Sequence, residues 1–429
     1  MISIDFQSKN TSQQFSLPGS KYIANRLVVL AALTNGESNF SNVPDNDDIR
    51  TAIAGLTQLG AKFEFSDNQL RCQGFGEELN APTEVVYTSH SGTFSRFVVA
   101  VAALFGDWIH LNGSAKMNSR PMADILDALS QSGVVIEASE GGRLPLKIKG
   151  PIQTDSISIS GAISSQYISA LLLIAGRCRQ GLKVQLTTEP VSKPYIAMTL
   201  ELLNIFGVEV QVAKDYRCFE VSAGQAYTPQ TMQVPADPSS ASYFLAYAAI
   251  TASHICLSNF QPELSVQGEA GFAKVLAQMG CKIWQDELGY HCQGPEELVG
   301  ITVDMGDMPD VAQTLCVVAA FAKGKTHIHN IENLAFKESN RIEDTATELR
   351  KTGLEVTTSA DSMTIEPQVM HAACFDTYDD HRMAMSLSLL ACRIKGVTMC
   401  DPEVVSKSFP TYWEYLRKLG FITDKIGKE

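Results

Sequence analysis

The sequence lacks the features that mark several classes of protein. Its longest apolar runs, such as residues 97–105 and 315–322, fall well short of the roughly 20 residues that a membrane-spanning helix needs. The first ten residues, MISIDFQSKN, have neither the charged-then-apolar order of a signal peptide nor the arginine-rich composition of a transit peptide. We therefore expect a cytoplasmic protein that has no membrane partner.

Positive charge, paired cysteines and metal-ligand motifs are also scarce. The chain has 34 Lys and Arg against 47 Asp and Glu, a net charge of −13, which argues against a nucleic-acid partner. Any anionic ligand must be held by cations that gather locally. The ten cysteines form no CxxC pair and the eight histidines form no HExxH motif, so we expect reduced thiols and no metal site.

What the sequence does have is an internal repeat. The pattern Leu-x-x-x-Gly occurs six times, with spacings of 73, 74, 73, 73 and 67 residues between its glycines. Those glycines are Gly60, Gly133, Gly207, Gly280, Gly353 and Gly420. Each copy closes an amphipathic helix, so each glycine is predicted to end its helix in a left-handed conformation. A strand pattern follows, as at residues 208–212, where valines alternate with other residues.

A second series of helices lies between these copies. Six segments are apolar nearly all round and are predicted to be buried helices: residues 27–33, 97–104, 168–175, 243–250, 311–322 and 383–394. Small polar or charged residues precede each one, and serine and aspartate are good N-caps. Cations such as Lys21 and Arg382 oppose the helix dipole unless an anion lies nearby, so these helix starts are candidate anion sites. Capped helices with solvated cations are the alternative interpretation.

The six repeats predict an α/β protein of two domains with three repeats each. The polar, turn-rich stretch of residues 222–238 follows the third repeat and predicts the break between domains. We expect one domain to span residues 21–235, and the other to combine residues 1–20 with residues 236–429. The ligand site is expected in the cleft between them, which is a common place for such a site.

Ten short motifs occur in order along the chain. They are LPGSK with Asn25-Arg26, SGT with Arg96, SRPM, SSQ, SKPY, Asp237 with SSAS, Pro309-Asp310, KES with Arg341, DHRMAM and KSFP. This ordered set resembles the 5-enolpyruvylshikimate-3-phosphate synthase family. The resemblance implies the two-domain enolpyruvyl transferase fold, an inside-out α/β barrel in which each domain has three βαβαββ repeats around buried helices. It also implies transfer of enolpyruvyl from phosphoenolpyruvate to the 5-hydroxyl of shikimate 3-phosphate, in the pathway to chorismate, without metal or cofactor.

The resemblance assigns roles to individual residues. The phosphoenolpyruvate site would comprise Lys21, His90, Gly92, Arg120, Gln166, Arg341, Arg382 and Lys407. The shikimate-3-phosphate site would comprise Lys21, Tyr22, Arg26, Ser164, Ser165, Gln166, Ser192, Tyr195, Asp310, Asn333 and Lys337. Proton transfer would involve Lys21, Asp310, Glu338 and Lys337, with His381 orienting Glu338. The arginines suit this chemistry independently, because a planar guanidinium binds phosphate or carboxylate through two parallel hydrogen bonds.

Two positions depart from the family pattern. Tyr22 replaces a serine that contacts the acceptor's carboxylate, and His90 replaces an asparagine near the donor's phosphate; Ala24 and Asn340 are smaller departures. These changes leave open a paralogue that acts on another shikimate-like or cyclitol phosphate, or a catalytically weak binding protein. The related transferase that acts on UDP-N-acetylglucosamine is disfavoured, because the loop AKMNSRP has no cysteine. We expect the protein to be a monomer.

Overall fold

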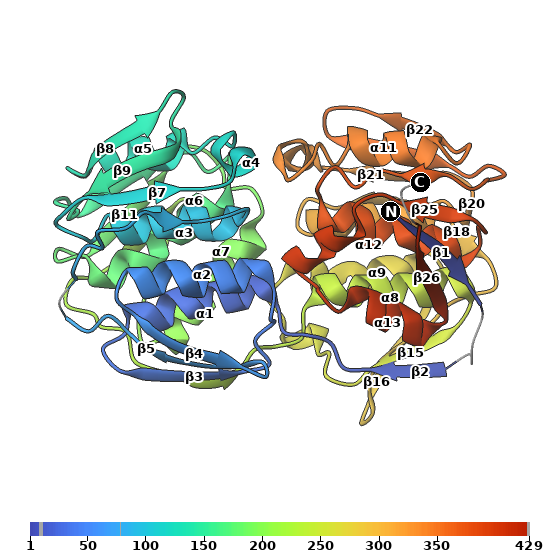
Figure 1. Cartoon of the computed structure of the whole chain (residues 1–429), viewed down its shortest axis with the longest axis horizontal. Helices are drawn as coiled ribbons and strands as arrows, with labels where there is room; N and C mark the ends of the chain where they lie inside the picture. Colours follow the sequence, from blue (N-terminus) through green and yellow to red (C-terminus); the bar gives the residue numbers. More distant parts are fainter. Residues whose placement is uncertain (8–11, 78, 427–429) are drawn as a thin grey trace. The chain divides into compact units, whose positions relative to one another are not determined.

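The chain folds into two compact units. The computed structural model describes residues 1–7, 12–77 and 79–426. Unit 1 contains Met1–Ser20 and Pro235–Glu429, and unit 2 contains Lys21–Val234. In Figure 1, unit 2 runs from blue to green, whereas unit 1 has the yellow-to-red segments and the first, dark-blue strands.

Unit 2 contains three four-stranded sheets built to the same plan. In each sheet the first two strands are parallel and the other neighbours are antiparallel. The first sheet has the order β14 (Thr231–Gln233), β3 (Glu37–Ser41), β5 (Gln69–Gln73), β4 (Lys62–Ser66). The second is β6 (Val86–Tyr87), β7 (Ile109–Asn112), β9 (Arg143–Lys149), β8 (Val135–Ser139). The third is β10 (Ser156–Ile159), β11 (Leu182–Leu186), β13 (Cys218–Val221), β12 (Gln211–Val212).

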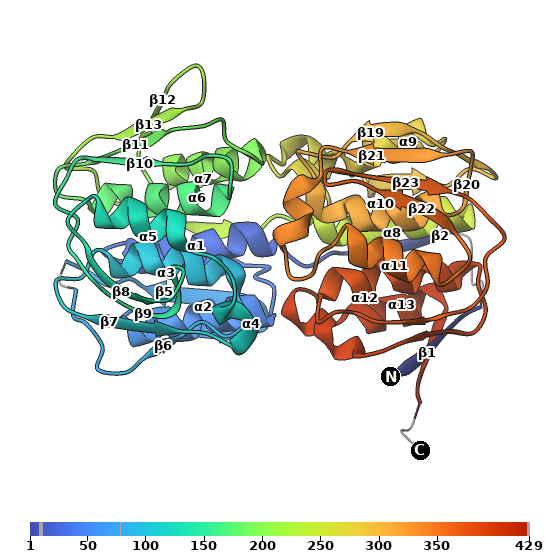
Figure 2. The ribbon, with the colours of Figure 1, turned by 90° about the horizontal axis from the view of Figure 1, so that it is seen from above.

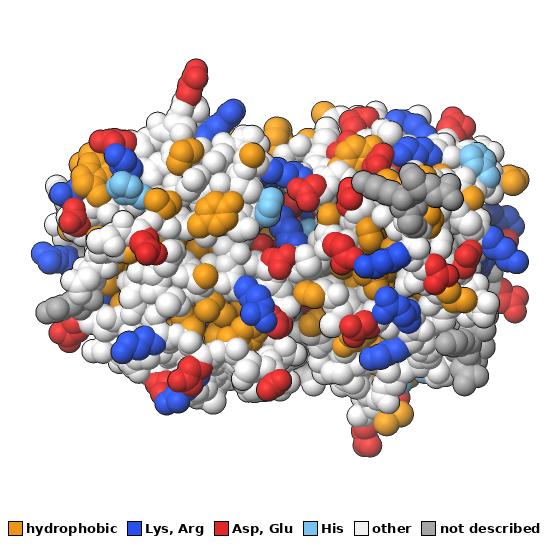
Figure 3. Space-filling model, viewed as in Figure 1, with side chains coloured by type: hydrophobic (Ala, Val, Ile, Leu, Met, Phe, Trp, Pro, Cys, Tyr) orange, Lys and Arg blue, Asp and Glu red, His pale blue; other side chains and the backbone are white. Residues whose placement is uncertain are grey.

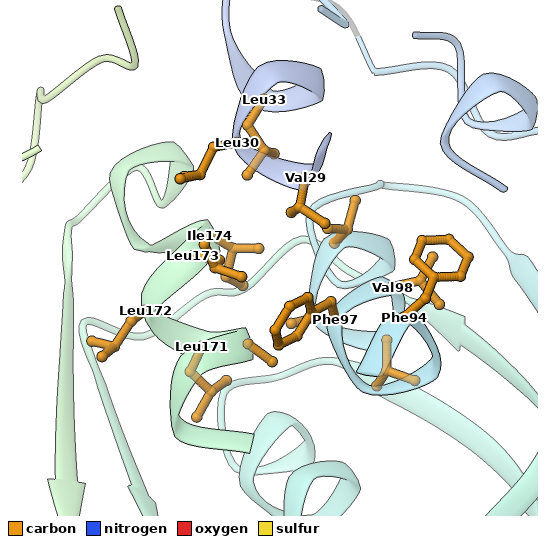
Figure 4. Packing of buried hydrophobic residues seen from close by; sticks show 14 of the residues in the cluster. Val29, Leu30, Leu33, Phe94, Phe97, Val98, Leu171, Leu172, Leu173 and Ile174 are labelled. Carbon is orange, nitrogen blue, oxygen red and sulfur yellow. The ribbon is translucent and has the colours of Figure 1, made fainter. Parts of the chain in front are cut away.

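Three buried helices form the core of unit 2. They are α1 (Lys21–Leu33), α3 (Gly92–Ala102) and α6 (Ser165–Ile174), and every residue of α1 is buried. Their apolar side chains share one core, in which Val29, Phe97 and Ile174 come from the three different helices (Figure 4). The remaining helical segments are α2 (Asp47–Gln58), α4 (Ala115–Asn118), α5 (Ala123–Ser130), α7 (Lys193–Ile205) and the 3-10 helix η1 (Ala175–Arg177).

Unit 1 repeats the same sheet plan three times. The parallel-then-antiparallel pairing recurs in each of its four-stranded sheets. The first is β2 (Ser12–Phe15), β15 (His254–Leu257), β17 (Gly289–Gln293), β16 (Lys282–Asp286). The second is β19 (Thr302–Asp304), β21 (Thr326–His329), β23 (Ser362–Glu366), β22 (Glu355–Thr358). The third is β24 (Cys374–Phe375), β25 (Val397–Met399), β1 (Ile2–Phe6), β26 (Phe421–Lys425). A separate two-stranded sheet is formed by β18 (Leu298–Val299) and β20 (Ala322–Lys323).

The helices of unit 1 also follow the repeat. The buried ones are α8 (Pro238–Thr251), α10 (Ala312–Ala319) and α12 (His381–Ser388). The others are α9 (Phe272–Gln278), α11 (Glu343–Arg350) and α13 (Tyr412–Leu419). Short 3-10 helices connect them: η2 (Pro262–Leu264), η3 (Gly268–Gly271), η4 (Pro309–Val311), η5 (Glu332–Phe336), η6 (Leu389–Cys392) and η7 (Pro402–Lys407). Figure 2 shows α10 and α8 lying inside the strands of this unit.

The repeat glycines and the buried helices agree with prediction, with local exceptions. All six glycines have φ between 81° and 110°, which is the left-handed conformation that ends a helix. The helix predicted at residues 311–322 spans only Ala312–Ala319, because Val311 still belongs to η4 and Ala322 enters β20. The one predicted at residues 383–394 tightens into η6 after Ser388. At residues 208–212 only Gln211–Val212 is strand, because β12 is an edge strand and pairs with β13 over those two residues alone.

The first strands of the chain belong to unit 1. β1 lies between β25 and β26, and β2 pairs with β15. In the first sheet of unit 2 the corresponding parallel position is taken by β14, close to the point where the chain leaves that unit. Each unit thus has a sheet that is completed by a strand from a distant part of the sequence.

Candidate functional site

The start of helix α3 lies among arginine side chains. Gly92 is the first residue of this helix, and a Cβ there would lie 2.6 Å from Arg120 Nη1 and 2.8 Å from Arg96 Nη1. Arg96 Nη1 also donates to the Gly92 carbonyl at 2.6 Å. The missing side chain therefore makes room for two guanidinium groups at a helix N-terminus. Cations repel each other and the dipole there unless an anion is bound, so this arrangement suits a phosphate or carboxylate.

Helix α6 begins beside this arginine pair. Gln166 Nε2 donates to Thr93 Oγ1 of α3 at 3.1 Å, which brings Gln166 next to Gly92. Ser164 caps α6 by accepting from the Gln166 backbone N–H at 3.3 Å, as the capping interpretation predicts, and Ser165 is buried in the first turn. His90, in contrast, is exposed, and its Nδ1 lies 3.0 Å from Ser114 Oγ.

Lys21 begins helix α1 and is buried. Its ammonium lies 3.5 Å from Asp48 Oδ2 and 5.4 Å from the centroid of the Tyr22 ring. Asp48 is in the first turn of α2 and is only 4% exposed. Sequence reasoning missed Asp48, although an acid in the first turn of the next helix is a signal that could have found it. The pairing holds the lysine at a fixed place instead of leaving it in solvent.

Arg26 is buried one turn further along α1. It donates from Nε to Thr199 Oγ1 at 2.8 Å and from Nη1 to the Tyr22 carbonyl at 2.9 Å. Its Nη2 donates to Ser169 Oγ at 3.2 Å and to the Tyr195 carbonyl at 3.1 Å. Burial lowers the pKa of Arg26 to about 10. These acceptors are all neutral oxygens, so the positive charge of Arg26 is held in place without being neutralised by them.

Two tyrosines adjoin Arg26, and one of them lies in the turn after Ser192. The Tyr22 and Tyr195 rings are 5.2 Å apart between centroids, and both are 7% exposed. Ser192 precedes α7 with φ 52° and ψ 49°, a left-handed conformation that is uncommon for serine and clusters at functional sites. Helices α6 and α7 pack against each other. Ser164 and Ser192 therefore lie at the starts of two neighbouring helices.

Arg341 is the centre of a buried ion-pair network in unit 1. It donates from Nε and Nη2 to Asp380 at 2.7 and 3.2 Å, from Nη1 to Asp310 at 3.0 Å, and from Nη2 to Glu338 at 2.9 Å. Arg341 is 1% exposed and Asp380 is fully buried. Burial on its own would lower the pKa of Arg341, but Asp380, Glu338 and Asp310 together raise it above its ordinary value. The guanidinium thus stays charged and fixes three carboxylates.

Three further cations contact the same carboxylates. Lys337 Nζ lies 3.2 Å from Asp310 Oδ1, and Arg382 Nη2 donates to Asp310 Oδ2 at 3.3 Å. Lys407 Nζ donates to Glu338 Oε1 at 2.7 Å. Each oxygen of Asp310 and of Glu338 therefore has a cation next to it. The predicted proton-transfer acids of this unit are held in one network with the predicted anion-binding cations.

Asp380 connects the network to helix α12. Its Oδ1 accepts from the Arg382 backbone N–H at 2.9 Å, which caps the helix, and its Oδ2 accepts from Ser339 Oγ at 3.0 Å. His381 Nδ1 lies 3.5 Å from Asp380 Oδ1. Asp380 was not among the residues predicted for the site, although its place directly before a helix start marks it as an N-cap. The orientation of Glu338 by His381 stays a prediction, and Asn333 lies half-buried in η5.

The predicted residues thus fall into two sets. Unit 2 holds Lys21, Tyr22, Arg26, His90, Gly92, Arg120, Ser164, Ser165, Gln166, Ser192 and Tyr195, and unit 1 holds Asp310, Asn333, Lys337, Glu338, Arg341, His381, Arg382 and Lys407. Arg96 and Asp380 belong to the predicted motifs but were assigned no role, and Asp48 is an additional member that prediction did not select. Within the described ranges, three or more His, Cys, Asp or Glu side chains nowhere gather in a way that could hold a metal ion.

Charged side chains of both signs lie on the outer surface. On the face drawn in Figure 3, acidic and basic side chains are interspersed over both units. None of the helices in the described part of the chain has the length and apolar character needed to span a bilayer.

Comparisons with known proteins agree on one family. The family model described as EPSP synthase (3-phosphoshikimate 1-carboxyvinyltransferase) matches residues 7–416. Proteins named 3-phosphoshikimate 1-carboxyvinyltransferase from Shewanella denitrificans and Yersinia pseudotuberculosis are each 40% identical to this chain. The first match covers 95% of this chain and 96% of that protein, and the second covers 94% and 95%.

Solved structures give the same answer for the fold. The EPSP synthase from Acinetobacter baumannii superposes with a TM-score of 0.83 at 25% identity, over 99% of both chains. The enolpyruvyl transferase NikO from Streptomyces tendae superposes with a TM-score of 0.75 at 17% identity, over 99% of this chain and 98% of that one. The fold is the two-domain enolpyruvyl transferase fold that the repeats and motifs predict.

Proposed function

This chain belongs to the EPSP synthase family, the 3-phosphoshikimate 1-carboxyvinyltransferases, and we propose how its two sets of residues carry out the family's reaction. The enzyme transfers the enolpyruvyl group of phosphoenolpyruvate to the 5-hydroxyl of shikimate 3-phosphate and releases phosphate, a step of the shikimate pathway. Both substrates are anionic. The side chains must therefore bind negative charge and also move protons.

The donor phosphoenolpyruvate is bound by the arginines and lysines of both sets. At the start of α3, Gly92 lets Arg120 approach the helix N-terminus, and Gln166 lies beside it. Lys21 and His90 complete the unit 2 contribution. From unit 1, the donor contacts Arg341, Arg382 and Lys407, which are already held by carboxylates. The planar guanidinium groups match the geometry of phosphate and carboxylate oxygens.

The acceptor shikimate 3-phosphate is bound mainly by unit 2. Ser164, Ser165 and Ser192 present hydroxyl groups at the starts of α6 and α7, where backbone N–H groups and the helix dipole favour a phosphate. Tyr195, Tyr22 and the uncompensated charge of Arg26 serve the ring and its carboxylate. Asp310, Asn333 and Lys337 of unit 1 serve the ring hydroxyls.

Proton transfer depends on the network around Arg341, and this observation carries the proposal. Asp310 accepts the proton of the attacking 5-hydroxyl, because its oxygens are already oriented by Arg341, Lys337 and Arg382. Lys21 and Glu338 deliver and remove the proton at the methylene carbon of the enolpyruvyl group. Glu338 is fixed between Arg341 and Lys407, so a carboxylate is presented without a metal.

Phosphate release tests the assignment directly. The purified chain is mixed with phosphoenolpyruvate and shikimate 3-phosphate, and Glu338→Gln and Lys21→Ala are compared with the exposed variant Glu297→Gln. We expect Glu338→Gln and Lys21→Ala each to lower kcat by roughly 10²-fold or more, which is the usual contribution of a general acid or base, while Glu297→Gln stays unchanged. Full activity in both site variants would contradict the assignment. Turnover with another phosphorylated cyclitol, but not with shikimate 3-phosphate, would contradict the acceptor.

We also propose the organisation of the working enzyme. Two domains, residues 21–235 and residues 1–20 with 236–429, supply residues to one active site, and the chain acts as a cytoplasmic monomer without cofactor. Light scattering coupled to gel filtration measures the mass in solution. A dimer mass at assay concentrations would contradict the monomer.

A further inference from the structure

Two cysteines outside the substrate-binding residues lie within reach of each other. The sulfur atoms of Cys374 and Cys400 are 3.9 Å apart, and Cys374 is exposed to solvent. Burial and the neighbouring Cys374 thiol raise the pKa of Cys400 to about 11. Cys374 is therefore the more accessible of the two thiols, and Cys400 is half-buried.

The sheet explains why the sulfurs approach although the backbones are offset. β24 and β25 are parallel neighbours in which Cys374 pairs with Thr398 and Phe375 pairs with Met399. Cys400 lies two residues beyond Thr398, so its side chain is on the same face of the sheet as that of Cys374. The two sulfur atoms are 3.9 Å apart, whereas a disulfide bond is only about 2.05 Å long. Closing the bond must therefore pull the ends of the two strands together.

Both strands lead directly into residues of the Arg341 network. β24 continues through Tyr378 and Asp379, which both have positive φ, to Asp380. Cys400 is followed by Asp401, also at positive φ, and then by η7, which ends at Lys407. Because the short turns are already in uncommon conformations, they have little freedom to absorb a shift of the strands. These two short segments are the routes by which a movement at the cysteines would reach Asp380 and Lys407.

We propose that Cys374 and Cys400 form a reversible disulfide when the protein meets a hydroperoxide, and that this bond slows the enzyme. The Cys374 thiolate attacks the peroxide oxygen, so the O–O bond breaks, an alcohol or water leaves, and Cys374 becomes a sulfenic acid. The Cys400 sulfur then attacks the Cys374 sulfur, the S–S bond forms, and the hydroxyl leaves as water with the Cys400 proton. Two electrons pass from the two thiols to the peroxide. A dithiol reverses the reaction by exchange.

The experiment uses the full chain and hydrogen peroxide as the probe. Peptide mapping without reductant measures the fraction of Cys374 joined to Cys400, and the buried cysteines Cys281 and Cys292 of the same unit serve as the internal control. We expect the Cys374–Cys400 linkage to form at least fivefold more than the control linkage. We expect kcat to fall at least fivefold and to return on treatment with dithiothreitol.

Two variants separate the disulfide from other oxidation. Cys374→Ser and Cys400→Ser should each keep the activity of the reduced enzyme and resist the peroxide-dependent loss. A mapped linkage of less than twofold over the control would overturn the proposal, and so would a complete linkage that leaves kcat and KM unchanged. The effect on turnover rests on the proposed function, but the mapping does not. If the reduced chain fails to turn over its substrates, linkage is still measured, so the two failures are distinguishable.

Discussion

Replacing Asp380 by asparagine tests whether the Arg341 network stabilises unit 1. The carboxylate is fully buried and accepts four hydrogen bonds, of which two come from Arg341, one from Ser339 and one from the Arg382 backbone. Asparagine keeps one oxygen, which can still cap α12. Its amide nitrogen, however, meets the donors of Arg341 and Ser339 with donors of its own.

The expected magnitude follows from this contact pattern. Removing one partner of a buried ion pair costs about 3–5 kcal/mol, and the lower end applies because Arg341 keeps Asp310 and Glu338. We therefore expect Asp380→Asn to lower the free energy of unfolding of unit 1 by about 3 kcal/mol. Asp380→Ala also removes the helix cap and should cost about 1 kcal/mol more.

Urea unfolding followed by tryptophan fluorescence measures this change. In a Trp108→Phe background the two remaining tryptophans, Trp284 and Trp413, both lie in unit 1. The matched control is Glu297→Gln, which breaks an ion pair to Lys323 whose side chains are 62% and 74% exposed. Such a pair contributes less than about 1 kcal/mol. An Asp380→Asn variant that is no less stable than this control would refute the reasoning.

Two further predictions concern recognition and pH. Tyr22→Ser removes the ring that adjoins Arg26, so that the substrate carboxylate can approach more closely; we expect the KM for shikimate 3-phosphate to fall about tenfold, the value of one charge-assisted hydrogen bond. We expect Tyr22→Phe, which keeps the ring, to leave this KM unchanged. Steady-state kinetics at saturating phosphoenolpyruvate measure both values, and an unchanged KM in Tyr22→Ser would count against the idea. Burial, together with Asp380 and Glu348 nearby, raises the pKa of Asp344. A carboxyl group whose pKa is raised by folding stabilises the folded state at pH values below its unfolded-state pKa, and this stability is lost as the pH rises through its folded-state pKa. The difference in unfolding free energy between Asp344→Asn and the wild type should therefore be more favourable to the variant at about pH 7 than at about pH 3. Urea unfolding at both values checks this, and a gain that is larger at the lower pH would contradict it.

The sequence predicts the fold where the determinants are local. A glycine such as Gly207 ends its helix because its own φ is left-handed. A segment that is apolar on all sides, such as residues 27–33 of α1, can be predicted to be buried from its own residues alone. The strands that complete each unit could not be predicted in this way. β14 pairs with β3 across most of unit 2, and β1 lies between two strands from the other end of the chain. Such pairings depend on tertiary contacts that no local pattern records.

The same distinction applies to the candidate site. Lys21, Arg341 and the other motif residues could be selected because their order along the chain resembles a known family. Their acidic partners were harder to select. Asp48 lies on the next helix after Lys21, and Asp380 contacts Arg341 from a different repeat of unit 1. Which carboxylate neutralises which cation is set by packing, so sequence order alone does not reveal it.

The two units differ in how far the charges of their buried cations are balanced by carboxylates, and this difference is the physical basis of the separate roles that we propose for them. In unit 2, Arg26 is surrounded by neutral oxygens, so a substrate carboxylate meets a positive charge that these oxygens do not neutralise. Serines lie at the starts of α6 and α7, where an incoming phosphate meets hydrogen-bond donors. In unit 1, four cations share three carboxylates, and an anion must compete with groups already bound. A net positive helix start suits substrate binding. A nearly balanced network suits proton transfer, because its carboxylates stay in place while one proton moves. A chain with a net charge of −13 can therefore bind two anions, since what counts is the charge within hydrogen-bond distance of each.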